Sequence, residues 1–225
     1  MSLACGTFTA FVEDQDVLGL VLEYLSGFDS LRLLQTNKAV RGAVTAALTK
    51  LNLMHLMHNK ITDVSPLASL TSLTALDLEE NDIADVSPLA SLTSLTALDL
   101  ERNNITDVSP LASLTKLIKL HLTGNTTLLD VAPLASLTKL TKLKLSFTKI
   151  TNVSPLASLT SLIELDLEEN EINDVSPLAS LTSLTGLDLE GNYIYDLSPL
   201  ASLTSLSCDG MISSAWLLDR LYPDA

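Results

Sequence analysis

Cysteine is almost absent from this chain of 225 residues, which contains only Cys5 and Cys208. These two residues lie near opposite ends of the sequence, so they would form a disulfide only if the chain ends met. We therefore predict free thiols, which are usual in a reducing compartment, and we expect a cytoplasmic protein. With 47% hydrophobic residues, the chain can bury a sizeable core in one or two domains.

Positive charge is also scarce, since 13 lysines and arginines stand against 27 aspartates and glutamates, for a net charge of −14. Duplex nucleic acids and anionic membranes are bound largely through lysine and arginine. The composition therefore predicts no nucleic-acid partner and no membrane partner. Long apolar runs are missing too, because none approaches the roughly 18 residues of a membrane span. The first residues have neither the basic region nor the apolar segment of a secretory signal, so we expect none.

What the sequence does contain is an internal repeat. The segment SPLASL begins at Ser65, Ser87, Ser109, Ser154, Ser176 and Ser198, with the variant APLASL at Ala132. Between these segments runs the pattern L-x-x-L-x-L-x-x-N-x-I, which is first complete at Leu73 and recurs at 22-residue spacing, except that Leu117 to Leu140 spans 23 residues. A degenerate copy begins at Leu51. Each copy is too small to bury its apolar face alone, so the copies must stack into a solenoid with a shared core.

Each copy predicts one short strand and one short helical turn. The leucines of L-x-L alternate with exposed residues, as in a strand. SPLAS predicts a tight turn with one turn of helix, because proline fixes φ and needs no amide donor there. An aspartate precedes most of these segments, and we expect its carboxylate to accept a hydrogen bond from the turn. These aspartates are Asp63, Asp85, Asp107, Asp130, Asp174 and Asp196.

The repeat LTxLxLxxNxIxDVSPLASLT resembles the leucine-rich repeat family and looks most like its internalin-type subclass, over residues 51–206. The resemblance implies an α/β fold: a curved, right-handed solenoid with a parallel sheet on the concave side and short 3-10 or helical segments on the convex side. It also implies an asparagine ladder that bonds neighbouring turns and should break at Thr148, where threonine replaces asparagine. The ladder residues are Asn59, Asn81, Asn103, Asn125, Asn170 and Asn192.

The two ends of the chain depart from the repeat, and the open ends of a solenoid need caps. Residues 207–225 predict a C-terminal helical cap that includes Trp216. Residues 1–50 predict helices, with Val17, Val21 and Leu25 on one apolar stripe, and their simplest role is an N-terminal cap. Residues 11–48 also resemble an F-box, which would dock a Skp-type adaptor of a ubiquitin ligase. The Leu-Pro opening and the tryptophan beside Arg41 that the F-box pattern has are missing here.

The copies differ from one another mainly at the outward positions of the strand segments, and these positions run acidic, basic, acidic along the chain. The first acidic group is Asp77, Glu79, Asp99 and Glu101; the basic group is Lys119, His121, Lys142, Lys144 and Lys149, with Phe147 beside it; the second acidic group is Asp166, Glu168 and Asp188, with Tyr193 beyond. Divergence confined to one face favours a binding surface for a protein or peptide of complementary charge. An exposed aromatic beside cations is typical of interface hot spots.

A structural interpretation of the lysines stays open. Adjacent strands lie roughly 4.8 Å apart. Lys142 and Lys144 would then neighbour Glu164 and Asp166 and would only neutralise them. Stacked acids such as Asp77 and Asp99 should repel each other, and a basic partner or bound cations would relieve that repulsion.

Catalytic chemistry is not indicated. A nucleophile needs a base beside it, whereas the serines and threonines here are mostly copies of a structural SLTSLT. The outward row His55, Asp77, Asp99 and His121 offers metal-ligand types, but a flat row does not converge as a tetrahedral site requires. We therefore expect a monomeric protein-interaction module that is not an enzyme and needs no cofactor or metal. The alternatives are an F-box-type substrate receptor and a designed or duplicated consensus solenoid without a specific partner.

Overall fold

The structure is a computed structural model, and it describes residues 56–206. The predictions for the two ends, a helical cap or F-box in residues 1–50 and a helical cap in residues 207–225, therefore lie outside the described residues. His55 and both cysteines lie outside them as well.

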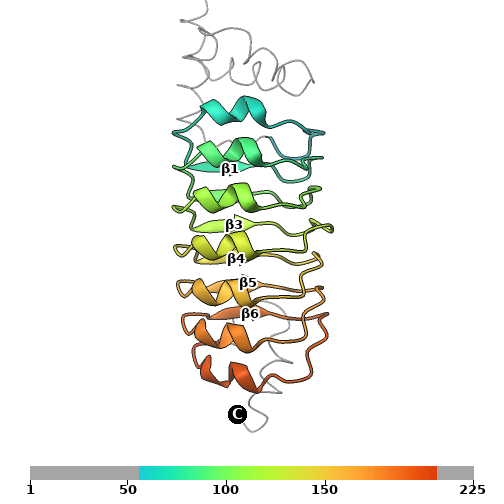
Figure 1. The fold of residues 1–225 in the computed structure, drawn as a ribbon, viewed down its shortest axis with the longest axis vertical. Coiled ribbons are helices and arrows are strands. Elements are labelled where there is room, and N and C mark those ends of the chain that lie inside the picture. The colour runs from blue at the N-terminus through green and yellow to red at the C-terminus, as the bar shows by residue number, and fades with distance from the viewer. Residues whose placement is uncertain (1–55, 207–225) are drawn as a thin grey trace, which may run out of the picture.

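The described chain is a stack of similar turns, each built from one strand and one 3-10 helix (Figure 1). The strands are β1 (Ala75–Asp77), β2 (Ala97–Asp99), β3 (Lys119–His121), β4 (Lys142–Lys144), β5 (Glu164–Asp166) and β6 (Gly186–Asp188). The 3-10 helices are η1 (Ser65–Ser69), η2 (Ser87–Ser91), η3 (Ser109–Ser113), η4 (Ala132–Ser136), η5 (Ser154–Ser158), η6 (Ser176–Ser180) and η7 (Ser198–Ser202). Figure 1 shows the 3-10 helices as one column and the strands as another behind it.

The six strands form one parallel sheet in chain order, and each pairs in register with the next. Equivalent residues of successive turns therefore lie side by side across the sheet. This arrangement confirms the predicted parallel-sheet solenoid with short 3-10 segments. Within residues 56–206, no helix has the length and hydrophobicity that a membrane span requires.

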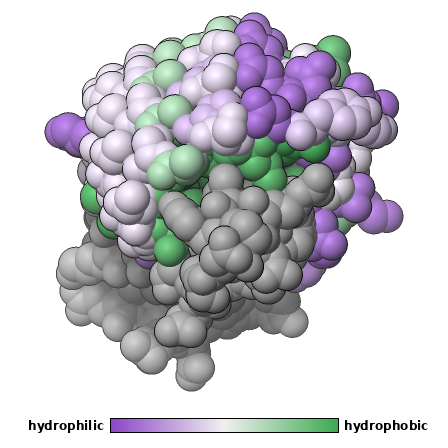
Figure 2. Space-filling view, turned by 90° about the horizontal axis from the view of Figure 1, so that it is seen from below, coloured by the Kyte–Doolittle hydropathy of each residue, from purple (hydrophilic) through white to green (hydrophobic). Residues whose placement is uncertain are grey.

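The core lies between the sheet and the 3-10 helices and consists mainly of leucine. In β3, Leu120 is fully buried whereas Lys119 is exposed, and the central leucine of every other strand is buried as well. Burial weakens toward the C-terminal end, where Leu197 is 9% exposed. Figure 2 looks along the stack from that end and shows hydrophobic residues between hydrophilic flanks. The core is thus continuous along the stack, as the repeat pattern predicts.

Buried asparagines connect each turn to its neighbours. Asn103 donates from Nδ2 to the carbonyl of Leu78 in the preceding turn, at 2.9 Å, and its Oδ1 accepts from the amide of Ile83, at 3.0 Å. Equivalent bonds are made by Asn81, Asn125, Asn170 and Asn192. Asn59, in the first described turn, bonds carbonyls of its own turn. Each bridging amide satisfies backbone groups that would otherwise be buried without a partner, which stabilises the fold by about 1 kcal/mol per bond.

Two further rows of hydrogen bonds organise the side of the 3-10 helices. Asp63 Oδ1 accepts from the amide of Ser65 at 2.8 Å, and the other aspartates that precede these helices do the same. The predicted turn-capping role of these aspartates is confirmed, and Asn152 takes that role before η5. Between turns, the hydroxyl of Ser91 donates to the carbonyl of Ala68 at 2.7 Å, and its counterparts repeat the bond along the stack.

One turn, between β3 and β4, is a residue longer than the others. The amide of Lys149 donates to the carbonyl of Leu128, just as the amide of Glu171 donates to the carbonyl of Ile150 one turn later. Leu128 therefore occupies the place of the regular isoleucine. The extra residue lies between Asn125 and Leu128, within the Thr126–Thr127 pair.

The longer turn compensates for the missing asparagine at position 148. A regular amide at that position would accept from the Leu128 N–H and donate to the Leu122 carbonyl. Instead, the Leu128 amide donates to the carbonyl of Asn125 at 2.9 Å, and the Leu122 carbonyl accepts from the backbone amide of Asn125 at 3.3 Å. The Leu122 carbonyl also accepts from Asn125 Nδ2, a bond within one turn that the regular asparagines make as well. The hydroxyl of Thr148 lies 3.0 Å from Leu145 O and 2.5 Å from Asn170 Oδ1, which belong to its own turn and the next. The predicted ladder break at Thr148 is confirmed, and the extra residue satisfies the groups it leaves.

This compensation predicts strong coupling between two changes. Deleting Thr126 removes the local turn and leaves backbone groups unpaired, whereas Thr148→Asn alone buries an amide without regular partners. Each single change should lower the free energy of unfolding, by about 1–3 kcal/mol. The double change restores a regular turn and should recover most of both losses, as a double-mutant cycle in urea would measure.

As a control, Asn103→Thr places threonine in a turn of regular length, where nothing replaces the lost bonds. It should destabilise the chain without rescue by Thr148→Asn. Additive effects of the deletion and Thr148→Asn would contradict the proposed compensation.

Candidate functional site

The outward side chains of the sheet form three rows, which we call the sheet face. Two rows come from the first and third residues of each strand, and the third row comes from the residue two positions beyond the strand. The rows are Ala75, Ala97, Lys119, Lys142, Glu164 and Gly186; Asp77, Asp99, His121, Lys144, Asp166 and Asp188; and Glu79, Glu101, Thr123, Ser146, Glu168 and Glu190. The predicted binding residues of the strands all lie on this face, and Phe147, Lys149 and Tyr193 lie at its margin, after the strands.

The middle of the sheet face is only partly neutralised by its acidic neighbours. Lys142 forms an ion pair with Glu164 on the next strand. Lys144 lies beside Asp166 in the sheet register, but Asp166 instead accepts from the hydroxyl of Ser146, at 3.1 Å. Within residues 56–206, Lys119, Lys144 and Lys149 form no ion pair. Charge balance therefore explains Lys142 and leaves the other three lysines to another explanation.

A histidine of β3 contacts the first acidic group across the sheet. His121 Nδ1 lies 2.7 Å from Asp99 Oδ2 on the neighbouring strand. Asp77, Asp99 and His121 are in register, as the row with His55 predicts, but they are spread over three strands. They form a flat row rather than a convergent ligand set.

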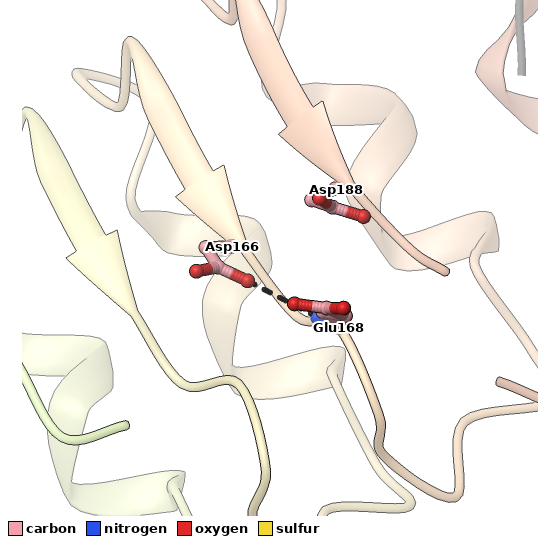
Figure 3. Close-up of side chains that lie close together, drawn as sticks. All are labelled: Asp166, Glu168 and Asp188. Carbon is pink, nitrogen blue, oxygen red and sulfur yellow. Dashed lines mark hydrogen bonds between the residues drawn. The ribbon is translucent and has the colours of Figure 1, made fainter. Parts of the chain in front are cut away.

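The second acidic group does bring carboxylates together. Asp166 and Glu168, in and just after β5, and Asp188 at the end of β6 have carboxylate oxygens within 4.8 Å of one another (Figure 3). Asp166 also accepts from the backbone amide of Glu168, at 3.2 Å. The sequence shows the stacked acids, but not that these three side chains converge. Exposed carboxylates are often this close without an ion, so the cluster does not by itself indicate a metal site.

Burial and like charges shift the ionisation of both acidic groups. Burial, followed by repulsion from Asp99, raises the pKa of Asp77. Burial and the neighbouring Glu101 raise the pKa of Glu79, and burial and Asp188 raise the pKa of Glu168. The predicted repulsion between stacked acids is therefore present in the structure, and a cation placed against either group would relieve it.

The margin after the strands contains an exposed aromatic residue in a strained conformation. Phe147 has a φ of 53° and is 49% exposed. The left-handed region costs a bulky residue about 1 kcal/mol or more, and glycine occupies the same position at Gly124 and Gly191. At Gly124 even a Cβ would lie 3.0 Å from Cγ of Arg102. His58, Glu80, Arg102 and Glu169 take the same left-handed conformation in other turns, so the backbone conformation does not account for phenylalanine at position 147.

Near the N-terminal end of the described stack, charged side chains at the same margin form ion pairs with one another. Glu80 pairs with both Arg102 and His58, across three successive turns. The hydrogen bond from Arg102 lowers the pKa of Glu80. Charged side chains satisfy one another there, whereas Phe147 and Lys149 stay open to solvent.

The raised pKa values predict a stability that increases on mild acidification. The folded state binds protons at Asp77, Glu79 and Glu168 more tightly than the unfolded chain, so ionising these groups costs stability. Stability should rise as the pH falls from about 7 toward the ordinary values of these carboxyl groups, 4.5 for the two glutamates and 3.8 for Asp77. The turn-capping Asp85, Asp107, Asp174 and Asp196 have lowered pKa values, because the serine two residues later donates hydrogen bonds, and their contribution is lost only below their ordinary value of 3.8.

Urea unfolding at about pH 7 and at pH 4.5, the ordinary value of a glutamate, checks this prediction. The variant Glu79→Gln with Glu168→Gln should be more stable than the wild type at the higher pH, and the difference should shrink at the lower one. Glu171→Gln, which lies outside the stacked acidic rows, serves as the control. A difference that does not depend on pH would contradict the expectation.

Comparison with known proteins places this geometry in a family. The family model described as leucine-rich repeats (2 copies) matches residues 47–91, 93–136 and 138–180. A search of curated proteins finds no match. Among solved structures, an internalin C2 from Listeria monocytogenes is 42% identical, with a TM-score of 0.69 over 72% of this chain and 71% of that chain.

Two other solved structures extend the comparison. An internalin (inlF) from Listeria monocytogenes is 43% identical, with a TM-score of 0.61 over 66% of this chain and 50% of that chain, so this chain spans about half of its length. The leucine-rich repeat ectodomain of the Arabidopsis receptor kinase HAESA, in complex with an IDA peptide hormone, is 27% identical, with a TM-score of 0.56 over 67% of this chain and 29% of that chain. The chain belongs to the leucine-rich repeat family, and within it the chain is similar to internalins.

Proposed function

We propose that this chain is a protein-interaction module that binds a partner protein or peptide on the sheet face. The observation that carries the proposal is the reversal of charge across β3 and β4. There Lys119, Lys144 and Lys149 form no ion pair within the described residues, although acidic groups lie on both sides of them.

The partner that suits this face carries charge in the opposite order: basic, acidic, basic. Its acidic part would meet the lysines, and its basic parts would relieve the repulsion around Asp77 and Glu168. Such complementarity sets specificity and association rate more than affinity. Phe147 supplies an aromatic anchor beside the cations, which is the composition of an interface hot spot.

The structural neighbours support this class of function. HAESA is a leucine-rich repeat receptor kinase whose structure was solved with a peptide hormone bound, and a second structure includes the co-receptor SERK1 as well. We infer a binding rather than a catalytic role, because the rows of the sheet face offer no nucleophile with a base and an orienting group beside it. The cytoplasmic location, the monomeric state and the F-box-like role of residues 11–48 stay predictions.

A pull-down from a matched lysate tests the sheet face directly. The wild-type chain is compared with the variant Lys144→Glu, Phe147→Ala and Lys149→Glu, which reverses two unpaired charges and removes the aromatic side chain. We expect partners captured by the wild type to be lost with this variant, because each change removes a contact on the face. Quantitative mass spectrometry of the bound fraction is the measurement.

The control is Lys60→Glu, which changes an exposed lysine far along the stack from β4. It should leave capture unchanged. If the same partners bind the wild type and the sheet-face variant equally, the binding surface lies elsewhere, and residues 11–48 become the next segment to test.

A further inference from the structure

We propose that the chain has a second interaction surface, at the side of the sheet where β3, β4 and β5 begin, and that it binds an acidic peptide segment carrying aliphatic side chains. This surface, the edge patch, consists of Lys116, Ile118, Lys139 and Ile163. Lys119 lies where it borders the sheet face. The proposal goes beyond the sheet face and does not depend on it.

The two isoleucines of the edge patch replace threonines that have a structural role. At this position Thr96, Thr141 and Thr185 each donate a side-chain hydrogen bond to the backbone carbonyl of the preceding turn. Isoleucine cannot make that bond. Ile118 and Ile163 are also 41% and 44% exposed, so they gain little from the core. The fold therefore loses a bond at each position and leaves an aliphatic side chain in water, which indicates a contact with another molecule.

The two lysines of the edge patch form no ion pair with any residue of the described part of the chain. The equivalent positions in the other described turns are serines: Ser72, Ser94, Ser161, Ser183 and Ser205. Within residues 56–206, Lys116 and Lys139 therefore stand in neighbouring turns of a row that is otherwise uncharged, and both are exposed. Within residues 56–206 neither forms an ion pair. The neutralisation that explains Lys142 does not apply to them.

The lysines gather rather than disperse at this edge. Lys119 pairs with Lys142 in the register of β3 and β4, and Lys116 and Lys139 precede the same two strands. Glu164, the acid at the next position of that row, is already paired with Lys142. Like charges on neighbouring strands destabilise each other. A ligand with carboxylates would remove that repulsion, and its aliphatic side chains would cover Ile118 and Ile163 on either side of Thr141.

The surroundings of the patch favour a short peptide segment over a membrane. The chain as a whole carries a net charge of −14, and the sheet face beside the patch is acidic on both sides of its lysines. An extended anionic bilayer would meet those acids, whereas a peptide confined to the edge would not. The patch consists of two unpaired lysines and two aliphatic side chains, which a short segment with a few acidic and aliphatic residues could cover.

The repeat itself supplies the variant that tests the proposal. Changing Lys116→Ser, Ile118→Thr, Lys139→Ser and Ile163→Thr gives each position the residue that most other turns carry. Each new threonine can donate to the preceding carbonyl, so this variant should melt at the same temperature as the wild type or higher. Loss of binding would then report the missing patch and not loss of the fold.

Peptide display selected on the full chain is the measurement. We expect wild-type selections to yield sequences in which aspartate or glutamate flanks leucine, isoleucine or valine. Synthesised with a fluorescent label, these peptides should bind the edge-patch variant at least about tenfold more weakly by anisotropy. Their binding should also weaken in about 1 M sodium chloride, where the screening length is about 3 Å. The sheet-face variant should bind them as the wild type does, which separates this proposal from the previous one.

Any of four outcomes would overturn the proposal. The first is that the selected peptides are not acidic and aliphatic, and the second is that they bind the edge-patch variant with unchanged affinity. The third is that the wild type, but not the edge-patch variant, sediments with vesicles containing phosphatidylserine, which would assign the patch to a membrane. The fourth is that light scattering detects dimers of the wild type but not of the edge-patch variant, which would assign the patch to a second copy of the chain.

Discussion

The whole architecture depends on keeping successive turns in one register, and the buried asparagine amide is the group that enforces it. Its two ends bond the backbone of the preceding turn, so a shift of one residue would leave both a donor and an acceptor unpaired in the core. A fixed register places equivalent residues in rows. Any residue that is copied with the repeat is therefore stacked on itself, and this applies to leucine and to aspartate alike.

For leucine this stacking is favourable, because each turn buries the apolar face of the next. For carboxylates it is unfavourable, and burial together with this repulsion raises the pKa values of Asp77, Glu79 and Glu168. The lysines interrupt the acidic rows over two turns. One of them, Lys142, is the counter-ion of Glu164, while Lys116 and Lys139 at the edge patch form no ion pair within the described residues. The same residue type therefore serves structure in one row and is free for binding in another.

The repeated features could be predicted from the sequence because each admits one solution. The leucine spacing requires a strand with its leucines inward, and the asparagine has only the neighbouring turn to bond. The features that sequence reasoning missed depend on side-chain direction within a row. These include the bond between His121 and Asp99, the convergence of Asp166, Glu168 and Asp188, and the left-handed backbone of Phe147. The threonine row was also missed, although its signal is visible as two isoleucines among threonines.

The long turn between β3 and β4 has a consequence for how the stack comes apart. In a linear array each unit touches only its neighbours, so cooperativity is limited by the weakest junction. At this junction the bridging amide is replaced by backbone hydrogen bonds within one turn, from Leu128 N–H to the Asn125 carbonyl and from Asn125 N–H to the Leu122 carbonyl, which do not connect that turn to the next. This junction therefore lacks the two hydrogen bonds that an asparagine makes to the preceding turn elsewhere, and we expect local opening to be easiest there. A ligand that contacts both β3 and β4 would hold the two turns together and would slow amide hydrogen exchange on both sides of this junction.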